Sequence, residues 1–193
     1  MYPLFDAHLA HDSLKSRDKW AYKWHFLKSV YPSFFDKFKD KQFNFLEIGV
    51  DKGGSLRAWK DYFPQARIVG IDINPECTFE EDRIHVAIGD QNDIDFLHKV
   101  NEEFGPFSII IDDGGHIGSC QVNSFKCLFP ELLPAGIYAV EDLEVGESVG
   151  FTKYISNASY NFSIGYKTYD SVVVLPSIKS INFFKYILVL EKE

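Results

Sequence analysis

The sequence predicts a Rossmann-like α/β fold: a doubly wound, mostly parallel sheet with a C-terminal antiparallel hairpin. Between residues 45 and 142, short runs of continuous apolar residues alternate with helix-like segments, which is typical of parallel strands covered on both faces. After residue 166, two apolar runs follow each other with no helical pattern between them, which favours antiparallel pairing. A chain of 193 residues is expected to form one domain, spanning 1–193.

The first part of the chain, residues 1–40, is expected to be helical from about Arg17 to Phe38. Apolar side chains recur there at helical spacing, at Trp20, Trp24, Leu27 and Phe34. Pro32 is expected to break this helix, because proline lacks a backbone N–H and its ring clashes with the preceding turn. We interpret the aromatic side chains of this segment as packing residues.

Residues 41–145 form the predicted core of the domain. The expected strands span 45–50, 66–73, 83–90, 107–112 and 135–142, and the expected helices span 55–63, 93–104 and 118–132. The connection at 74–82 is too short for a full helix. Strands that alternate with helices in this way predict a parallel sheet with helices on both faces.

Residues 146–193 are expected to end in an antiparallel hairpin. Its two runs are "KTYDSVVVLPS" at 167–177 and "FFKYILVLEKE" at 183–193. Such a hairpin would close one edge of the sheet.

Composition narrows the class of protein. The formal net charge is -8, which argues against a nucleic-acid partner. The three cysteines, Cys77, Cys120 and Cys127, contain no CxxC pair, so a reducing compartment is the simpler interpretation. The first twenty residues carry scattered charges and do not resemble a signal peptide, and no run is long enough to span a bilayer. We expect a cytoplasmic protein with no membrane partner.

Every predicted parallel strand delivers an acidic residue to its carboxyl end. In an open α/β sheet, ligands bind outside these ends, so the acids are expected to share one cleft. They are Glu47, Asp72, Asp90, Asp112, Asp113, Glu141 and Asp142, with Gly49, Gly53, Ser55, Gln91 and His116 beside them. Any one acid could simply cap the following helix. Five consecutive strand ends are harder to explain in that way, because crowded carboxylates repel unless a cation or a hydroxyl-rich ligand satisfies them.

The first turn, "EIGVDKGGS", indicates what kind of ligand this is. A dinucleotide fingerprint needs GxGxxG, but here Asp51 stands where the second glycine belongs and would repel a pyrophosphate. A cationic ligand without phosphates fits an acidic site better. Asp72, about twenty residues further on, is placed to hold two ribose hydroxyls.

These residues resemble the class I S-adenosylmethionine-dependent methyltransferases. The match lies in Glu47 and Gly49, in Asp72 at the end of the second strand, and in Asp90 after the third. More narrowly, "LEIGVDKGGSLRAWKDYFPQARIVGIDINP", "VAIGDQND" and "IIDDGGHIGSCQVNSFKCLFPELLPAGIYAVEDL" are similar to the metal-dependent sugar O-methyltransferases of macrolide tailoring, of the macrocin and mycinamicin type. The resemblance covers roughly residues 16–144, and it implies a class I methyltransferase fold.

The resemblance implies a role for each motif residue. His116 would be the general base, and Asp113, Glu141 and Asp142 would hold Mg²⁺. Asp112 would lie near the methionine end of S-adenosylmethionine, with the adenine near Asp90 and Gln91. The full set of expected cofactor-binding residues is Glu47, Gly49, Gly53, Ser55, Asp72, Asp90, Gln91 and Asp112.

The implied chemistry suits these residue types. Carboxylates without thiolates favour a hard ion such as Mg²⁺, which would orient sugar hydroxyls and make them more acidic. An imidazole can then remove the hydroxyl proton near neutral pH. The resemblance therefore implies an O-methyltransferase that acts on a sugar or a glycosylated small molecule.

Two other functions stay open at this stage. One is a protein that binds S-adenosylmethionine without transferring its methyl group, and the other is an NAD-dependent oxidoreductase. The segment between the fifth strand and the tail is shorter than in the macrolide enzymes, so another subunit of a homo-oligomer could complete the acceptor side.

Overall fold

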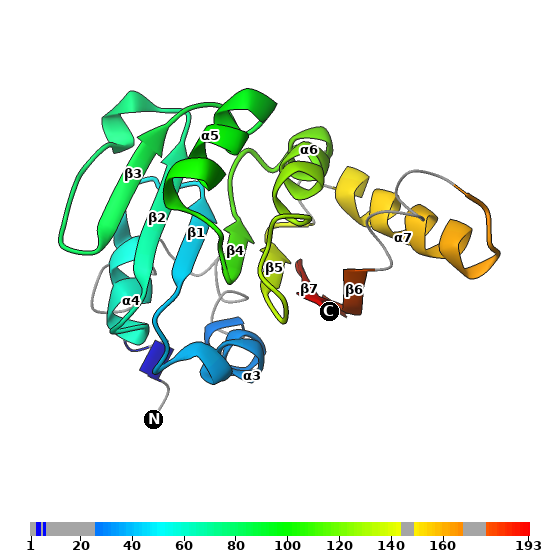
Figure 1. The fold of residues 1–193 in the computed structure, drawn as a ribbon, viewed down its shortest axis with the longest axis horizontal. Coiled ribbons are helices and arrows are strands. Elements are labelled where there is room, and N and C mark those ends of the chain that lie inside the picture. Colours follow the sequence, from blue (N-terminus) through cyan, green and yellow to red (C-terminus); the bar gives the residue numbers. More distant parts are fainter. Residues whose placement is uncertain (1–2, 5, 7–25, 144–148, 168–176) are drawn as a thin grey trace.

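The computed structural model describes residues 3–4, 6, 26–143, 149–167 and 177–193 (Figure 1). Trp20 and Trp24, which were expected in the N-terminal helix, lie outside this part of the chain. A central sheet is flanked on both sides by helices, and helix α7 (Val149–Ser163) extends away from the body (Figure 1).

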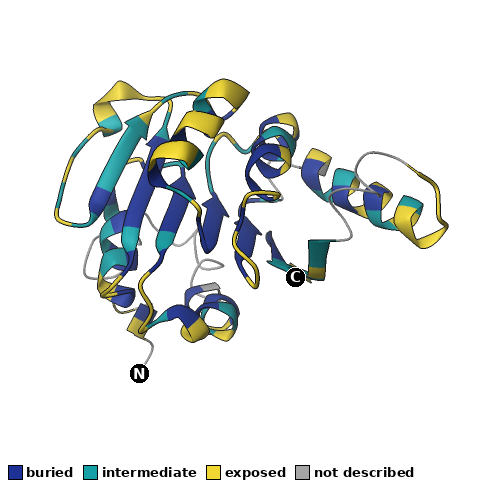
Figure 2. Ribbon diagram, viewed as in Figure 1, coloured by how far each residue is buried: buried dark blue, intermediate teal, exposed yellow. Residues whose placement is uncertain are grey.

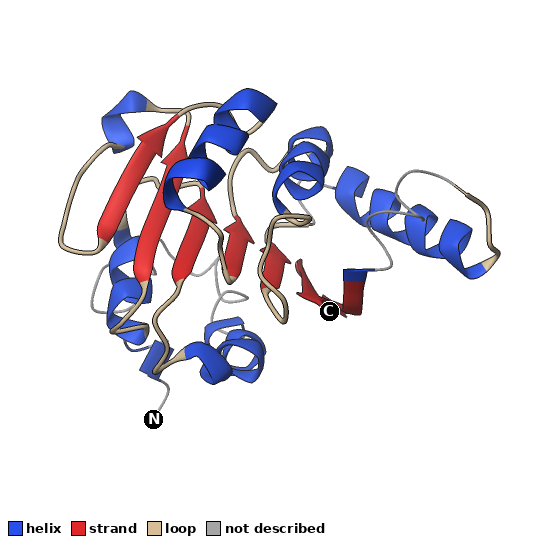
Figure 3. Cartoon of the chain, viewed as in Figure 1, coloured by secondary structure: helices blue, strands red, loops and turns tan. Residues whose placement is uncertain are grey.

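The sheet has seven strands in the order β3-β2-β1-β4-β5-β7-β6 (Figure 3). Neighbouring strands from β3 to β5 pair in parallel, β7 pairs antiparallel with β5, and β6 pairs antiparallel with β7. The strands are β1 Asn44–Ile48, β2 Arg67–Asp72, β3 Ile84–Ile88, β4 Ile109–Asp112, β5 Ile137–Val140, β6 Ile178–Phe184 and β7 Ile187–Lys192. The predicted fold class is therefore confirmed, although most strands are shorter than the sequence indicated.

Hydrophobic residues fill both faces of the sheet, because successive side chains of a strand point to opposite sides. Phe45 packs with Trp59 of α4 (Gly54–Tyr62), and Trp59 in turn packs with Phe35 of α3 (Tyr31–Phe35). Its neighbour Leu46 belongs to the opposite cluster, which α5 (Ile94–Phe104), α6 (Gly118–Leu128) and α7 cover. Figure 2 shows the central strands buried and the outer sides of the helices exposed. The sheet is thus held rigidly from both sides.

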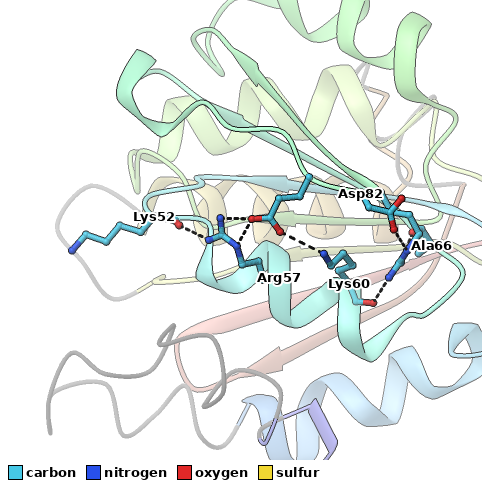
Figure 4. Close-up of polar contacts among 7 residues, drawn as sticks. Lys52, Arg57, Lys60, Ala66 and Asp82 are labelled. Carbon is cyan, nitrogen blue, oxygen red and sulfur yellow. Dashed lines mark hydrogen bonds and ion pairs between the residues drawn. The ribbon is translucent and has the colours of Figure 1, made fainter.

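A polar network fixes the segment before β3 to helix α4 (Figure 4). Arg57 donates through Nε to Glu81 Oε1 at 2.7 Å, and Lys60 Nζ lies 3.4 Å from Glu81 Oε2. The Arg83 guanidinium donates to the carbonyls of Phe63, Ala66 and Lys60. As the sequence indicated, the connection between β2 and β3 contains only a short 3-10 helix, Pro75–Cys77. The network therefore replaces a crossover helix in holding β3.

The N-terminal helical segment differs from the prediction at Pro32. A π-helix, Phe26–Val30, continues directly into α3, and a 3-10 helix, Asp36–Phe38, follows. Pro32 lies in the first turn of α3, a position at which helices tolerate proline. The predicted break is therefore wrong.

The C-terminal part differs in its bounds. The antiparallel pair is confirmed, but it consists of β6 and β7, joined at Lys185 and Tyr186, and Tyr186 adopts a positive φ of 68°. Most of the expected first run, 167–177, lies outside the described residues. Helix α7 was not predicted, because its many Ser, Asn and Thr residues have modest helix propensity. Its apolar side chains Phe151 and Ile155 pack into the core and stabilise it.

Candidate active site

The carboxyl ends of the parallel strands lie level with one another, as the sequence predicted. Ile48 pairs with Ile71 of β2 and with Asp112 of β4, and Asp112 pairs with Val140 of β5. The residues that follow these positions therefore emerge at one edge of the sheet. The predicted acids occupy this edge, but their side chains divide between the two faces of the sheet.

Asp72 organises the first turn of the fold. Its Oδ2 accepts hydrogen bonds from the backbone N–H groups of Val50 at 2.8 Å and Asp51 at 3.2 Å, and Oδ1 accepts one from Asn74 at 2.8 Å. Partial burial tends to raise the pKa of Asp72, but these N–H donors outweigh it and hold the pKa below its usual value. Asp72 is therefore ionised at neutral pH and has lone pairs left for ligand hydroxyls.

The glycines of the first turn allow two loops to approach closely. Gly49 has a φ of +96°, and a Cβ built on it would lie 2.4 Å from the carbonyl oxygen of Asp113. Gly53 has a φ of +72° and sits against the ring of Phe79. Alanine would be strained at both positions, and at Gly49 it would also displace backbone of the β4 loop.

Glu47 and Ser55 are joined at the start of the first turn, where Glu47 is buried and Ser55 is half-buried. Glu47 is 3% exposed, and its Oε2 accepts a hydrogen bond from Ser55 Oγ at 2.8 Å. This bond ties the first turn of α4 to β1, so both side chains shape the turn. Asp90 is exposed, and its Oδ1 accepts a bond from the N–H of Asn92 at 2.8 Å.

Asp112 and Asp113 point to opposite faces of the sheet, as alternation along a strand requires. Asp112 is fully buried and accepts a hydrogen bond from Ser124 Oγ of α6 at 2.6 Å. Burial raises the pKa of Asp112, while the bonds from Ser124, Gly114 and Gln91 act in the opposite direction. The structure thus places Asp112 beneath the loop, and it places Asp113 at the edge.

Three predicted residues come together at the edge of the sheet. Ligand atoms of Asp113, His116 and Asp142 all lie within 4.8 Å of one another. His116 Nε2 is 3.7 Å from Asp142 Oδ2, and the Nδ1 atom of His116 is buried with no hydrogen-bond partner among the described residues. His116 and Asp142 adopt positive φ angles of 49° and 54°. Such strained conformations cluster at functional sites, which agrees with a site here.

The two carboxylates of this group fit a hard divalent cation. Oxygen donors converging from two loops are the ligands that Mg²⁺ prefers. An imidazole within the same small space, with one buried nitrogen unpaired, can either complete a ligand set or take up a proton. The group can therefore hold a cation beside a base.

Glu141 lies outside this group, although the sequence placed it with Asp113 and Asp142. Its Oε1 accepts a hydrogen bond from the hydroxyl of Tyr31, which comes from α3. Ala139, two residues earlier in β5, packs in the same hydrophobic cluster as Tyr31, so alternation directs Glu141 to that face.

Tyr31 and Ser124 are the polar residues that sequence reasoning missed. Burial raises the pKa of Tyr31 well above its usual value, and nearby Glu141 raises it further. Tyr31 is 110 residues from Glu141 along the chain. In the sequence it stands out only as one of several aromatic residues at helical spacing. Nothing in the sequence separated Ser124 from other polar residues of a surface helix.

A separate cavity of about 840 Å³ lies at the amino-terminal edge of the sheet. Its lining includes Asn44 and Arg67, which begin β1 and β2, and Ser108, which precedes β4. Ligands of parallel α/β sheets bind at the other edge, where the acids are. Within the described part of the chain, none of the helices combines the length and the apolar composition of a membrane-spanning segment.

Comparison with known proteins identifies similar sequences but no matching family model. The chain is 40% identical over 141 residues to 8-demethyl-8-(2-methoxy-alpha-L-rhamnosyl)-tetracenomycin-C 3'-O-methyltransferase of Streptomyces olivaceus, covering 69% of this chain and 36% of that protein. It is 40% identical over 134 residues to mycinamicin VI 2''-O-methyltransferase of Micromonospora griseorubida, covering 66% and 34%. It is 39% identical over 139 residues to demethylmacrocin O-methyltransferase of Streptomyces fradiae, covering 67% and 35%. The matched region is about a third of the length of these relatives.

Solved structures show the same likeness. MycE methyltransferase from the mycinamycin biosynthetic pathway, in complex with Mg, SAH and mycinamycin VI, superposes with a TM-score of 0.83 at 29% identity, covering 98% of this chain and 53% of that one. A caffeoyl-CoA O-methyltransferase candidate from Staphylococcus aureus shares the fold, with a TM-score of 0.60 at 13% identity.

Proposed function

We propose that this chain, which has the class I methyltransferase fold and is similar to the mycinamicin- and macrocin-type sugar O-methyltransferases, is a Mg²⁺-assisted O-methyltransferase. The proposed donor is S-adenosylmethionine, and the proposed acceptor is a hydroxyl of a sugar or a glycosylated small molecule. The observation that carries the proposal is the meeting of Asp113, His116 and Asp142 at the carboxyl edge of the sheet.

The cofactor side is built for a ligand without phosphates. S-adenosylmethionine, when bound, supplies a methyl group on a sulfonium, and the acids at this edge suit its positive charge. Asp72 would accept hydrogen bonds from the ribose hydroxyls, and Asp90 would lie near the adenine. Asp51, in the left-handed conformation with a φ of 48°, occupies the turn that would otherwise face a pyrophosphate, which counts against NAD.

Asp113 and Asp142 are the proposed holders of the cation, and Glu141 remains a predicted third ligand. Bound Mg²⁺ would lower the pKa of an acceptor hydroxyl. Asp142 is almost fully buried, so its carboxylate is held in place by its surroundings.

His116 is the proposed general base. The side chain is about one third exposed, so an acceptor hydroxyl can reach the imidazole. A proton taken from that hydroxyl would leave His116 positively charged, and Asp142 Oδ2, 3.7 Å from Nε2, would stabilise the charge. Removing the proton raises the nucleophilicity of the acceptor oxygen towards the methyl group.

Calorimetric titration tests which ligand the site binds. The titrants are S-adenosylhomocysteine and NAD, each with and without Mg²⁺. Methyl transfer from S-adenosylmethionine is then screened over nucleotide sugars and glycosylated small molecules. We expect S-adenosylhomocysteine to bind and NAD not to bind, and we expect methyl transfer to depend on Mg²⁺. Binding without turnover would favour the adenosylmethionine-binding protein, and NAD binding would favour the oxidoreductase.

The variant His116→Ala tests the base. We expect it to bind S-adenosylhomocysteine within about threefold of the wild type and to lose about 100-fold or more in kcat. The matched control is His98→Ala, because His98 is exposed on α5 and contacts Cys127, away from the edge. Wild-type turnover by His116→Ala would remove this residue from the mechanism.

We also expect the protein to act in the cytoplasm, to form a homo-oligomer, and to have no nucleic-acid or membrane partner.

A further inference from the structure

The side chain of Gln91 uses both ends of its amide inside the protein. Its Oε1 accepts a hydrogen bond from the backbone N–H of Gly115 at 2.7 Å. Its Nε2 donates to Asp112, at 3.3 Å from each carboxylate oxygen. Only an oxygen can accept from Gly115 and only an NH₂ group can donate to a carboxylate, so the contacts fix the orientation of the amide. Gln91 is 8% exposed.

Asp112 anchors the other end of this connection. Its carboxylate is fully buried and receives Ser124 Oγ at 2.6 Å and the N–H of Gly114 at 3.4 Å. A Cβ on Gly114 would lie 2.4 Å from Gln91 Oε1, so the glycine lets the amide lie directly against the loop. The loop between Asp113 and His116 is therefore held from below by two buried side chains.

This loop needs such support. His116 adopts a φ of 49°, a conformation that costs a non-glycine residue energy and persists only where surrounding contacts impose it. The loop also carries Asp113, a member of the acid–histidine group. Small displacements of reacting groups reduce catalysis strongly.

We propose that Gln91 is a positioning residue that holds the Asp113–His116 loop in its working conformation through Gly115 and Asp112. This inference rests on the proposed function and replaces the expected adenine contact of Gln91 and the expected methionine contact of Asp112. Because Gln91 follows Asp90 on the cofactor side, it links that side of the site to the loop that bears the base.

The test variant is Gln91→Met, which keeps the length of the side chain and removes both polar ends. We expect the Gly115 amide to exchange with deuterium about tenfold or more faster, measured by NMR. The Kd for Mg²⁺ should rise about tenfold and kcat should fall about tenfold to 100-fold. The Kd for S-adenosylhomocysteine should stay within about threefold.

The control is Asn92→Ala, because the side chain of the neighbouring Asn92 hydrogen-bonds to Cys120 Sγ and to Asn123, which lie on α6 and not in the loop. It should match the wild type in all four measurements. If Gln91→Met does not fold, Gln91→Glu supplies the comparison. Glu keeps an acceptor for Gly115 but sets a carboxylate against Asp112, so it should weaken Mg²⁺ binding while Gly115 exchange stays slow.

Two results would overturn the proposal. One is Gly115 exchange in Gln91→Met equal to that of the wild type. The other is a rise of about tenfold in the Kd for S-adenosylhomocysteine with kcat unchanged, which would make Gln91 a cofactor contact. If the wild type transferred no methyl group, the proposed function would fail, but amide exchange and Mg²⁺ titration would still decide the role of Gln91.

Discussion

Replacing Gly49 by alanine tests whether the first turn and the β4 loop are fitted to each other. The new Cβ would lie 2.4 Å from the Asp113 carbonyl oxygen, and ordinary contact begins at 3.4 Å, so this carbonyl would have to move by about 1 Å. The positive φ costs alanine about 1 to 2 kcal/mol, and the overpacking about 1 to 3 kcal/mol more. We therefore expect the free energy of unfolding to fall by about 2 to 5 kcal/mol.

The same displacement should reduce activity. A shift of about 1 Å in Asp113 is expected to lower kcat about 100-fold, measured at a temperature where the variant is folded. Urea unfolding gives the stability and methyl transfer gives kcat. The matched control is Gly165→Ala, because Gly165 has a φ of +71° with nothing within 4 Å of the added Cβ. It should lose only about 1 to 2 kcal/mol and keep its kcat. Equal stability losses in the two variants, or full activity in Gly49→Ala, would refute the argument.

Three further changes have defined outcomes. Asp142→Asn keeps the shape of the side chain and removes its charge, so the Kd for Mg²⁺ in calorimetry should rise about tenfold or more; an unchanged Kd would place the cation elsewhere. Asp72→Asn should weaken S-adenosylhomocysteine binding about tenfold or more. Because the folded pKa of Asp72 lies below its usual 3.8, its stabilisation is complete above that pH and is lost as the pH falls through the folded pKa. The difference in unfolding free energy between the wild type and Asp72→Asn, measured in urea, should therefore be constant at higher pH and shrink in acid. A difference that grows in acid would contradict a lowered pKa of Asp72. Tyr31→Phe removes the bond to Glu141 and should lower the free energy of unfolding by about 1 to 3 kcal/mol. Burial keeps the pKa of Tyr31 above 10.0, so ionisation of the Tyr31 hydroxyl should not change this loss at neutral or mildly alkaline pH.

Much of the fold follows from local patterns in the sequence. Continuous apolar runs between helices can only be buried on both sides, and parallel pairing then sends all their carboxyl ends to one edge. The gathering of Asp113, His116 and Asp142 follows from this rule. Helix α7 was missed because packing on α6, which a short-range pattern does not contain, supplies most of its stability.

The direction of each acid at the edge was harder to predict. Alternation sets Asp112 and Glu141 on opposite faces of the sheet, but only the structure shows what lies on each face. Asp112 meets Ser124 and Gln91 beneath the loop. Glu141 meets Tyr31, whose position depends on how an N-terminal helix packs against the sheet. Such long-range meetings have no signal in a single sequence.

The position of β7 between β5 and β6 bears on how the chain acquires its structure during synthesis. The first five strands can pair in parallel as they leave the ribosome, but the outer edge of β5 gains its partner only when residues 187–192 have been made. Until then its backbone N–H and carbonyl groups are an open template for pairing with other nascent chains. The yield of native protein should consequently depend on how quickly translation passes through the last strand.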